Sequence, residues 1–117
     1  MDTNLVLRDG TTTLTTTETL TSVVIGPMVH PLWLHVLVPA ATGTLDVSLE
    51  FCAAAAPTTK ISSLLMKQIT AIGYYSVPFY TQHENLQVKL TTASSPNFGA
   101  VKVWIAPEHR GKGPYNA

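Results

Sequence analysis

Charged residues are scarce in this chain of 117 residues: Asp, Glu, Lys and Arg make up 12% of it, and seven acidic residues balance seven basic ones. Soluble domains usually carry about twice that share. Proteins that bind nucleic acid need an excess of Lys and Arg to neutralise phosphates, so the zero net charge argues against nucleic acid as a partner. A chain without net charge also lacks the repulsion that keeps monomers apart, which mildly favours a protein that functions as part of an assembly.

Cysteine and long apolar stretches are also lacking. Cys52 is the single cysteine, so no disulfide can form within the chain and the fold must depend on its core. No basic neighbours suggest a lowered pKa, and we interpret Cys52 as a small buried hydrophobe. The apolar run from Leu32 to Val38 is far shorter than the roughly 20 residues of a membrane helix. No signal-peptide pattern opens the chain, so we expect synthesis in the cytoplasm and no membrane partner.

Alternation of apolar and polar residues is what the chain has in abundance. In TLDVSLEFC the residues Leu45, Val47, Leu49 and Phe51 alternate with polar ones, the period of two that a half-buried antiparallel strand imposes. Less regular alternation predicts further strands at 32–38, 74–80, 86–91 and 101–105.

Prolines, glycines and apolar faces refine these strand predictions. Pro78 lies inside the strand at 74–80 and marks it as an edge or bulged strand, because proline cannot donate to a ladder. The strand at 32–38 has apolar residues on both faces, which favours a central strand or one partly covered by a neighbour. The SSPNFG piece at 94–99 predicts a bend, with Gly99 in a conformation that other residues resist, before the last strand.

Two segments allow more than one interpretation. The threonine-rich run that follows Asp9 and Gly10 favours an extended, exposed arm, because threonine is β-branched. In KISSLLMKQITAIG the apolar residues fit either a short helix or a strand from about Leu64 to Ile69. We favour the strand, with AAAAPTTK as the loop before it.

The strands number about eight and recur about every ten residues, a spacing typical of a sandwich or small barrel. The sequence therefore predicts one all-β domain, an antiparallel β-sandwich of jelly-roll or Greek-key type. We expect residues 1–20 to form an extended N-terminal arm and first strand, residues 21–107 the sandwich core, and residues 108–117 a C-terminal tail that has lost periodicity.

No residue pattern indicates catalysis, a cofactor or a metal. His30 and His35 fall on opposite faces of one predicted strand, so they cannot share a metal ion. His83 lies in the polar TQHEN piece, typical of a solvated hairpin turn. Asp46 and Glu50 share a strand face but have no His or Ser beside them. We predict that the protein is not an enzyme and that it has no catalytic, cofactor-binding or metal-binding residues.

Aromatic residues suggest a contact surface. Tyr74, Tyr75 and Tyr80 crowd one predicted strand, and Trp33 and Trp104 each lie opposite the apolar face of theirs. Either another part of the chain covers these rings, or they form an outward patch that meets a second protein, where Trp and Tyr are enriched. A carbohydrate-binding face is a further alternative, although no cluster of Asp, Asn and Arg surrounds them.

Four segments, LVLRDGT, TGTLDVSLE, ITAIGYYSVPF and SPNFGAVKVWI, resemble small head-associated proteins of tailed bacteriophages. In that family a β-sandwich subunit decorates or cements the outside of an assembled capsid. The resemblance implies a structural virion protein on the capsid exterior, made in the bacterial cytoplasm, that binds the major capsid protein and bridges its neighbouring copies. It also implies self-association, with a trimer favoured. It assigns a role to no individual residue.

On this hypothesis the N-terminal arm, the tail and the outward aromatics are the parts that touch neighbouring chains. The candidate contact residues are Leu5, Arg8, Leu14, Trp33, Tyr74, Tyr80, Trp104, His109, Arg110 and Tyr115. Two alternatives remain: another virion part, such as a head-to-tail or tail-associated β-protein, and a carbohydrate-binding β-sandwich module.

Overall fold

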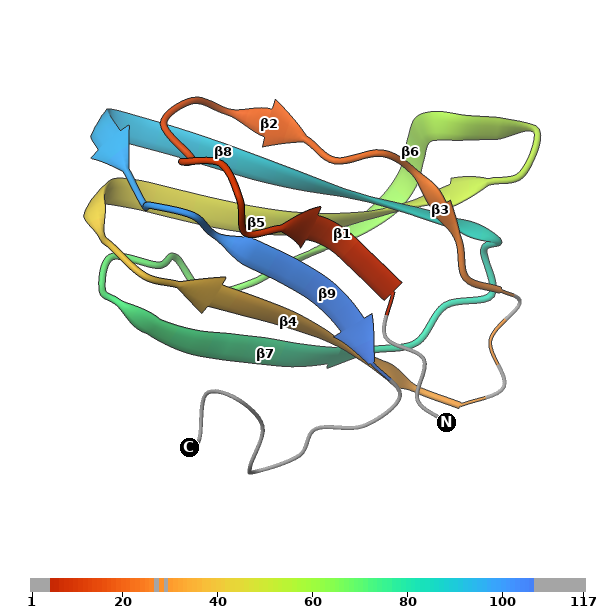
Figure 1. Ribbon diagram of the computed structural model, residues 1–117. Coiled ribbons are helices and arrows are strands. Elements are labelled where there is room, and N and C mark those ends of the chain that lie inside the picture. Colours follow the sequence, from red (N-terminus) through yellow and green to blue (C-terminus); the bar gives the residue numbers. More distant parts are fainter. Residues whose placement is uncertain (1–4, 27, 29, 107–117) are drawn as a thin grey trace.

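The computed structural model describes residues 5–26, 28 and 30–106, and within these ranges the chain forms nine strands and no helix (Figure 1). The all-β prediction is confirmed. The strands are β1 (Leu5–Asp9), β2 (Glu18–Thr19), β3 (Val23–Val24), β4 (Leu32–Val38), β5 (Thr42–Ala53), β6 (Ala56–Leu65), β7 (Gly73–Phe79), β8 (Asn85–Asn97) and β9 (Lys102–Ala106).

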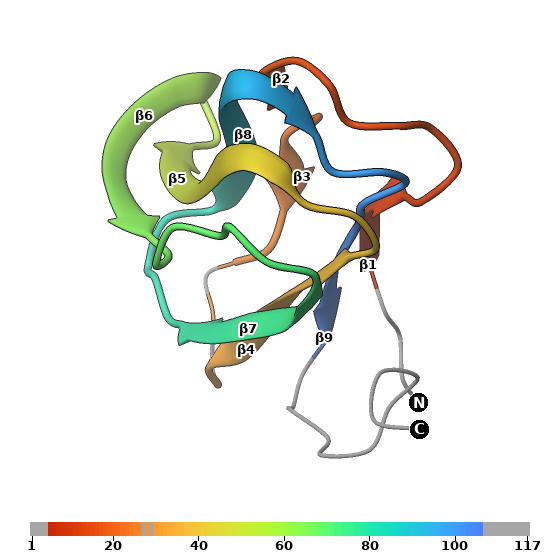
Figure 2. The same ribbon diagram turned by 90° about the vertical axis from the view of Figure 1, so that its left-hand side faces the viewer.

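The strands form two antiparallel sheets packed face to face as a sandwich (Figures 1 and 2). Sheet A has the order β1-β9-β4-β7; sheet B has the order β2-β8-β5-β6, and β3 also pairs with β8. If β2 and β3 count as one interrupted strand, the first strand pairs with the last, the second with the second last, and so on inward to the β5–β6 hairpin. An antiparallel ribbon rolled up in this way is a jelly roll.

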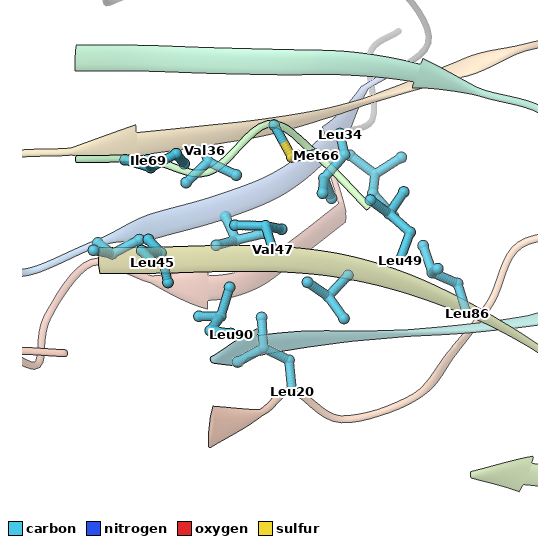
Figure 3. Packing of buried hydrophobic residues seen from close by; sticks show 14 of the residues in the cluster. Leu20, Leu34, Val36, Leu45, Val47, Leu49, Met66, Ile69, Leu86 and Leu90 are labelled. Carbon is cyan, nitrogen blue, oxygen red and sulfur yellow. The ribbon is translucent and has the colours of Figure 1, made fainter. Parts of the chain in front are cut away.

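The core lies between the two sheets and follows the period of two (Figure 3). Along β5 the predicted inward residues Leu45, Val47 and Leu49 have no exposed surface. Successive side chains of a strand point to opposite faces, so each strand gives every second residue to this layer. The other large buried side chains include Leu34, Val36, Met66, Ile69, Leu86, Val88 and Leu90.

Both positional predictions for the strands of sheet A are confirmed. β7, which contains Pro78, is at the edge of the sheet. An edge strand has no partner on its far side, so the missing N–H of a proline there breaks no hydrogen bond between strands. β4, with apolar residues on both faces, lies between β9 and β7.

The first strand expected within residues 1–20 is present, but the chain that follows it does not form an exposed arm. β1 is the edge strand of sheet A, where it pairs with β9. Beyond it, Leu14 is fully buried, its N–H donates to the Gly99 carbonyl at 2.8 Å, and its carbonyl accepts from the Phe98 N–H at 3.0 Å. The threonines around Leu14 are exposed, but this leucine and Leu20 fill the core between them. Burying two leucines holds the segment against the sandwich.

The prediction for the middle of the chain also needs correction. β5 and β6 form a long hairpin around the pair Ala54 and Ala55, so most of the expected AAAAPTTK loop is strand. The strand expected from Leu64 to Ile69 is interrupted: β6 ends at Leu65, but the chain continues antiparallel along β5. The Met66 N–H donates to the Val47 carbonyl at 2.9 Å, and Ile69 forms an isolated bridge with Leu45. The side chains of Met66 and Ile69 are buried in the core.

The bend expected within 94–99 lies at the end of that range. β8 continues to Asn97 through a distortion at Ser94 and Ser95, whose φ angles are 66° and 54°. Opposite them Gly43 has a φ of 91°, and a Cβ there would lie 2.4 Å from the Ala93 carbonyl oxygen. The chain then turns at Gly99, whose positive φ of 70° agrees with the prediction for that residue.

Candidate functional site

Three rings from three neighbouring strands stack on the outer face of sheet A. The ring centroid of His35 on β4 lies 5.1 Å from that of Trp104 on β9 and 5.7 Å from that of Tyr74 on β7, with an interplanar angle of 14° to each. The centroids of Tyr74 and Trp104 are 6.3 Å apart, so each of the three rings contacts the other two. The register aligns these strands, since His35 pairs with Trp104 and Leu37 pairs with Tyr74. Parallel rings at these separations attract beyond their area of contact. We call Tyr74, His35 and Trp104 the aromatic row.

Polar groups contact the members of the aromatic row. The Tyr74 hydroxyl hydrogen-bonds Nδ1 of His35, and the Lys102 ammonium lies 5.4 Å from the centroid of a Trp104 ring. A cation at that distance is attracted by the negative face of the ring. His35 and Trp104 are 1% and 6% exposed, whereas Tyr74 and the neighbouring Trp33 are half-buried. The aromatic row is therefore well ordered. Tyr74 is its member that reaches the surface, and the neighbouring Trp33 is also partly exposed.

The middle of the outer face of sheet B, along β5 and β8, is polar. Along β5, Asp46, Ser48 and Glu50 point away from the core, and Gln87 of β8 lies beside them. The Gln87 amide donates to the Glu50 carboxylate at 2.9 Å and to the Thr58 carbonyl at 3.2 Å. These hydrogen bonds connect three strands of sheet B through side chains. On sheet A, stacked aromatic rings connect neighbouring strands instead.

Arg8 joins the two sheets at the edge formed by β1 and β2. Its guanidinium donates to both carboxylate oxygens of Glu18, at 3.0 and 3.1 Å, and to the carbonyls of Thr12 and Val101, each at 2.8 Å. The residue is 6% exposed. Two parallel bonds to one carboxylate give this ion pair a defined geometry. We call these contacts the Arg8 clasp.

The predicted contact residues therefore separate into distinct environments. Leu14 is buried and Arg8 is engaged within the fold, so neither presents a free side chain to a neighbour. Leu5 on β1 is exposed, and Tyr80 after β7 is half-exposed while its hydroxyl donates to the Met28 carbonyl at 3.1 Å. Trp33, Tyr74 and Trp104 share the outer face of sheet A. His109, Arg110 and Tyr115 lie outside the described residues.

His35 is the member of this site that sequence reasoning did not select. Its odd position between Trp33 and Leu37 assigned it to the outer face, which the structure shows. The alternation within one strand carries no information on which residue of β9 or β7 lies beside it. That depends on the register between strands about 40 and 70 residues away along the chain.

The described part of the chain offers few groups for chemistry. Between residues 5 and 106, apart from 27 and 29, no three His, Cys, Asp or Glu side chains gather closely enough to hold a metal ion. The Cys52 thiol has no exposed surface, and burial, with a smaller effect of the Glu50 carboxylate, raises its pKa. No helix in the described residues is long and apolar enough to span a membrane.

No protein-family model, curated protein or solved structure matches the chain at a significant level.

Proposed function

We propose that this protein is a structural component of a phage virion that binds the outer surface of the assembled capsid and bridges neighbouring capsid subunits. The observation that carries the proposal is the contrast between the outer faces of the two sheets. Sheet A presents a preorganised aromatic surface, with Trp33 and Tyr74 half-buried, while the middle of sheet B, along β5 and β8, presents polar side chains such as Gln87 and Glu50 that are paired with each other. Large rings held in place contribute contact area at low entropic cost.

The outer face of sheet A is the surface that meets the capsid in this proposal. Trp33 and Tyr74 present partly exposed rings, and Lys102 adds one positive charge beside Trp104. This combination of aromatics with few charges is the composition of the centre of protein interfaces. The exposed Val6 on β1 pairs with Trp104, so it shares this face and extends the apolar surface at the edge of the sheet.

Binding of this kind stabilises a capsid by mass action. A protein that binds the assembled lattice and not the free subunits adds its binding free energy to the resistance of the shell to heat and internal pressure. Copies that associate with each other on the lattice gain avidity, so each single contact can remain weak. Neither step needs a catalytic group or a cofactor.

The test mixes the purified protein with phage heads that lack it. We expect added density on the shell in electron micrographs and a raised melting temperature of the heads. The variant Trp33→Ala should bind at least about tenfold more weakly, which corresponds to about 1.4 kcal/mol. The matched variant Thr91→Ala, at an exposed position on the outer face of sheet B, should bind as the unchanged protein does.

Other outcomes of the same preparation would favour the other functions. Rings of purified protein in negative stain would point to a head-to-tail or tail-associated part. Stacked aromatic rings also suit sugar faces, so binding of the isolated protein to a glycan array would point to a carbohydrate-binding module. Failure to bind any form of the capsid would reject the proposal.

A further inference from the structure

β6 is an open strand at the edge of sheet B. In Figure 2 it forms the outer rim of the sandwich, and none of the described strands pairs with its far side. Most of its side chains are exposed, among them Ile61 at 53% and Leu65 at 64%. A strand edge of this kind presents unpaired backbone N–H and C=O groups together with apolar side chains, which makes it a template for another strand.

The other sheet edges in the described part of the chain are blunted. β7 contains the exposed Pro78, β1 has a bulge between Val6 and Arg8, and β2 and β3 have two residues each. Short strands, bulges and prolines are the devices by which proteins prevent pairing at sheet edges. The first half of β6 has the same devices, since it contains Pro57 and two register shifts against β5, but from Ser62 to Leu65 the ladder is regular. Its second half therefore lacks the protection found elsewhere.

We infer that β6 pairs antiparallel with β6 of a second copy of this chain, about a two-fold axis at Ser63. A strand that pairs antiparallel with its own copy is self-complementary, so a single surface serves both partners and the assembly closes as a dimer. The two sheets B then join into one continuous sheet.

The side chains select this register. Ser63 and Leu65 pair with Glu50 and Ser48 of β5, which places them on the outer face of sheet B, and alternation places Ile61 there too. A two-fold axis through the sheet at Ser63 sets Ile61 of each copy opposite Leu65 of the other, so both exposed apolar residues gain an apolar partner. A register centred on Lys60 would place two like charges face to face.

The same register keeps the two Lys60 ammonium groups apart. They lie six residue steps from each other along the paired strands, which corresponds to about 20 Å at strand spacing. That distance exceeds the screening length of about 8 to 10 Å at physiological salt, so their repulsion is largely removed.

This dimer does not depend on the proposed role at the capsid, since β6 belongs to sheet B and the proposed contact surface to sheet A. It does differ from the trimer that the resemblance implies. Pairing about one two-fold axis uses up the open edge of both copies and leaves no equivalent edge for a third.

The first test measures the mass of the purified full chain by analytical ultracentrifugation over a range of concentrations. We expect a monomer–dimer equilibrium, weakened at least about tenfold by the double variant Ile61→Lys/Leu65→Lys, because it sets lysine opposite lysine twice. Both side chains are already exposed, so the fold should tolerate the change. The matched double variant Val24→Lys/Ile72→Lys, at exposed apolar positions outside β6, should leave the equilibrium unchanged.

The second test fixes the register. At the centre of an antiparallel pair the two Cα atoms lie about 4.5 to 5.5 Å apart, within the range of a disulfide. Ser63→Cys should therefore form a covalent dimer on mild oxidation, whereas Thr21→Cys, exposed but away from β6, should not. A protein that stays monomeric at about 100 μM would overturn the inference. So would a trimer, a dimer that survives the double lysine change, or a dimer that Ser63→Cys does not cross-link.

Discussion

The two sheets of this sandwich share an inner layer but differ on their outer faces. Inside, both give alternate Leu, Val and Ile side chains to the same core. Outside, sheet A stacks Tyr74, His35 and Trp104, while sheet B pairs polar side chains such as Gln87 and Glu50. The inner face of a sandwich strand is constrained by packing, whereas the outer face is free to vary with what it must meet. We therefore look for function on the outer faces, and for stability on both.

The difference between the two outer faces is tested most strongly by removing the Trp104 ring from the aromatic row. Trp104 is 6% exposed although it faces outward, so Trp104→Ala should lower the free energy of unfolding by about 3 to 5 kcal/mol, the usual cost of deleting a buried large ring. Urea unfolding followed by circular dichroism measures this. Thr91→Ala on the opposite outer face should stay within about 0.5 kcal/mol. Equal effects of both changes would show that the outer faces do not differ in this way.

The next largest effect should come from the contact that holds the sheets together. Arg8→Ala removes the Arg8 clasp and leaves the Thr12 and Val101 carbonyls without this donor, so we expect a loss of about 2 to 3 kcal/mol. Glu18→Gln should cost less, because the Glu18 side chain is 34% exposed and the backbone contacts of Arg8 remain. Chemical unfolding of both variants measures the difference. An Arg8→Ala protein as stable as the parent would mean that the clasp contributes nothing to holding the sheets together.

A smaller effect is expected from the polar side of the comparison. Gln87→Ala removes two hydrogen bonds on the outer face of sheet B and should lower the free energy of unfolding by about 1 to 2 kcal/mol. A double-mutant cycle with Glu50→Ala isolates the share that belongs to their mutual contact. A coupling energy near zero would show that the side chains are neighbours without stabilising each other.

The smallest effect on stability should be seen at Cys52 of β5, the strand beside β6. Burial raises the pKa of this thiol above its ordinary value of 9.0, so its contribution to stability is fully present below about pH 9 and is lost as the pH rises towards the folded-state value. At pH 8 we expect a thiol reagent to label the folded protein slowly and the urea-unfolded protein at once. The variant Cys52→Ala supplies the unlabelled baseline. Fast labelling of the folded chain would mean that the hairpin of β5 and β6 opens readily.

The predictable parts of the fold were those in which a local pattern has only one physical outcome. Strict alternation from Leu45 to Phe51 cannot fit a helix, and Pro78 cannot lie in a central strand. The failures involved segments whose pattern permits two outcomes. The threonine-rich segment around Leu14 is compatible with an exposed arm and with a segment packed on the edge of the sandwich. The hydrogen bonds of Leu14 to Phe98 and Gly99, which are distant in sequence, hold it in the second arrangement.

The candidate site shows the same division. Sequence reasoning placed Trp33, Tyr74 and Trp104 on outward positions, because parity along a strand is a local property. It left open whether another part of the chain covers Trp104, which is buried. It did not anticipate that His35 would stack with two rings or that Arg8 would be held by Glu18. Each of these depends on contacts between strands that are distant in sequence.

The sequence by itself determined the class of fold, the inner face of each regular strand and the edge position of β7, because hydrophobic period and proline chemistry act within a few residues. Only the tertiary structure decided the jelly-roll order, the fate of the N-terminal segment, the aromatic row of sheet A and the open edge at β6. Those features arise from the choice of partner strand and register, and many pairings of the same strands bury the same leucines and valines almost equally well.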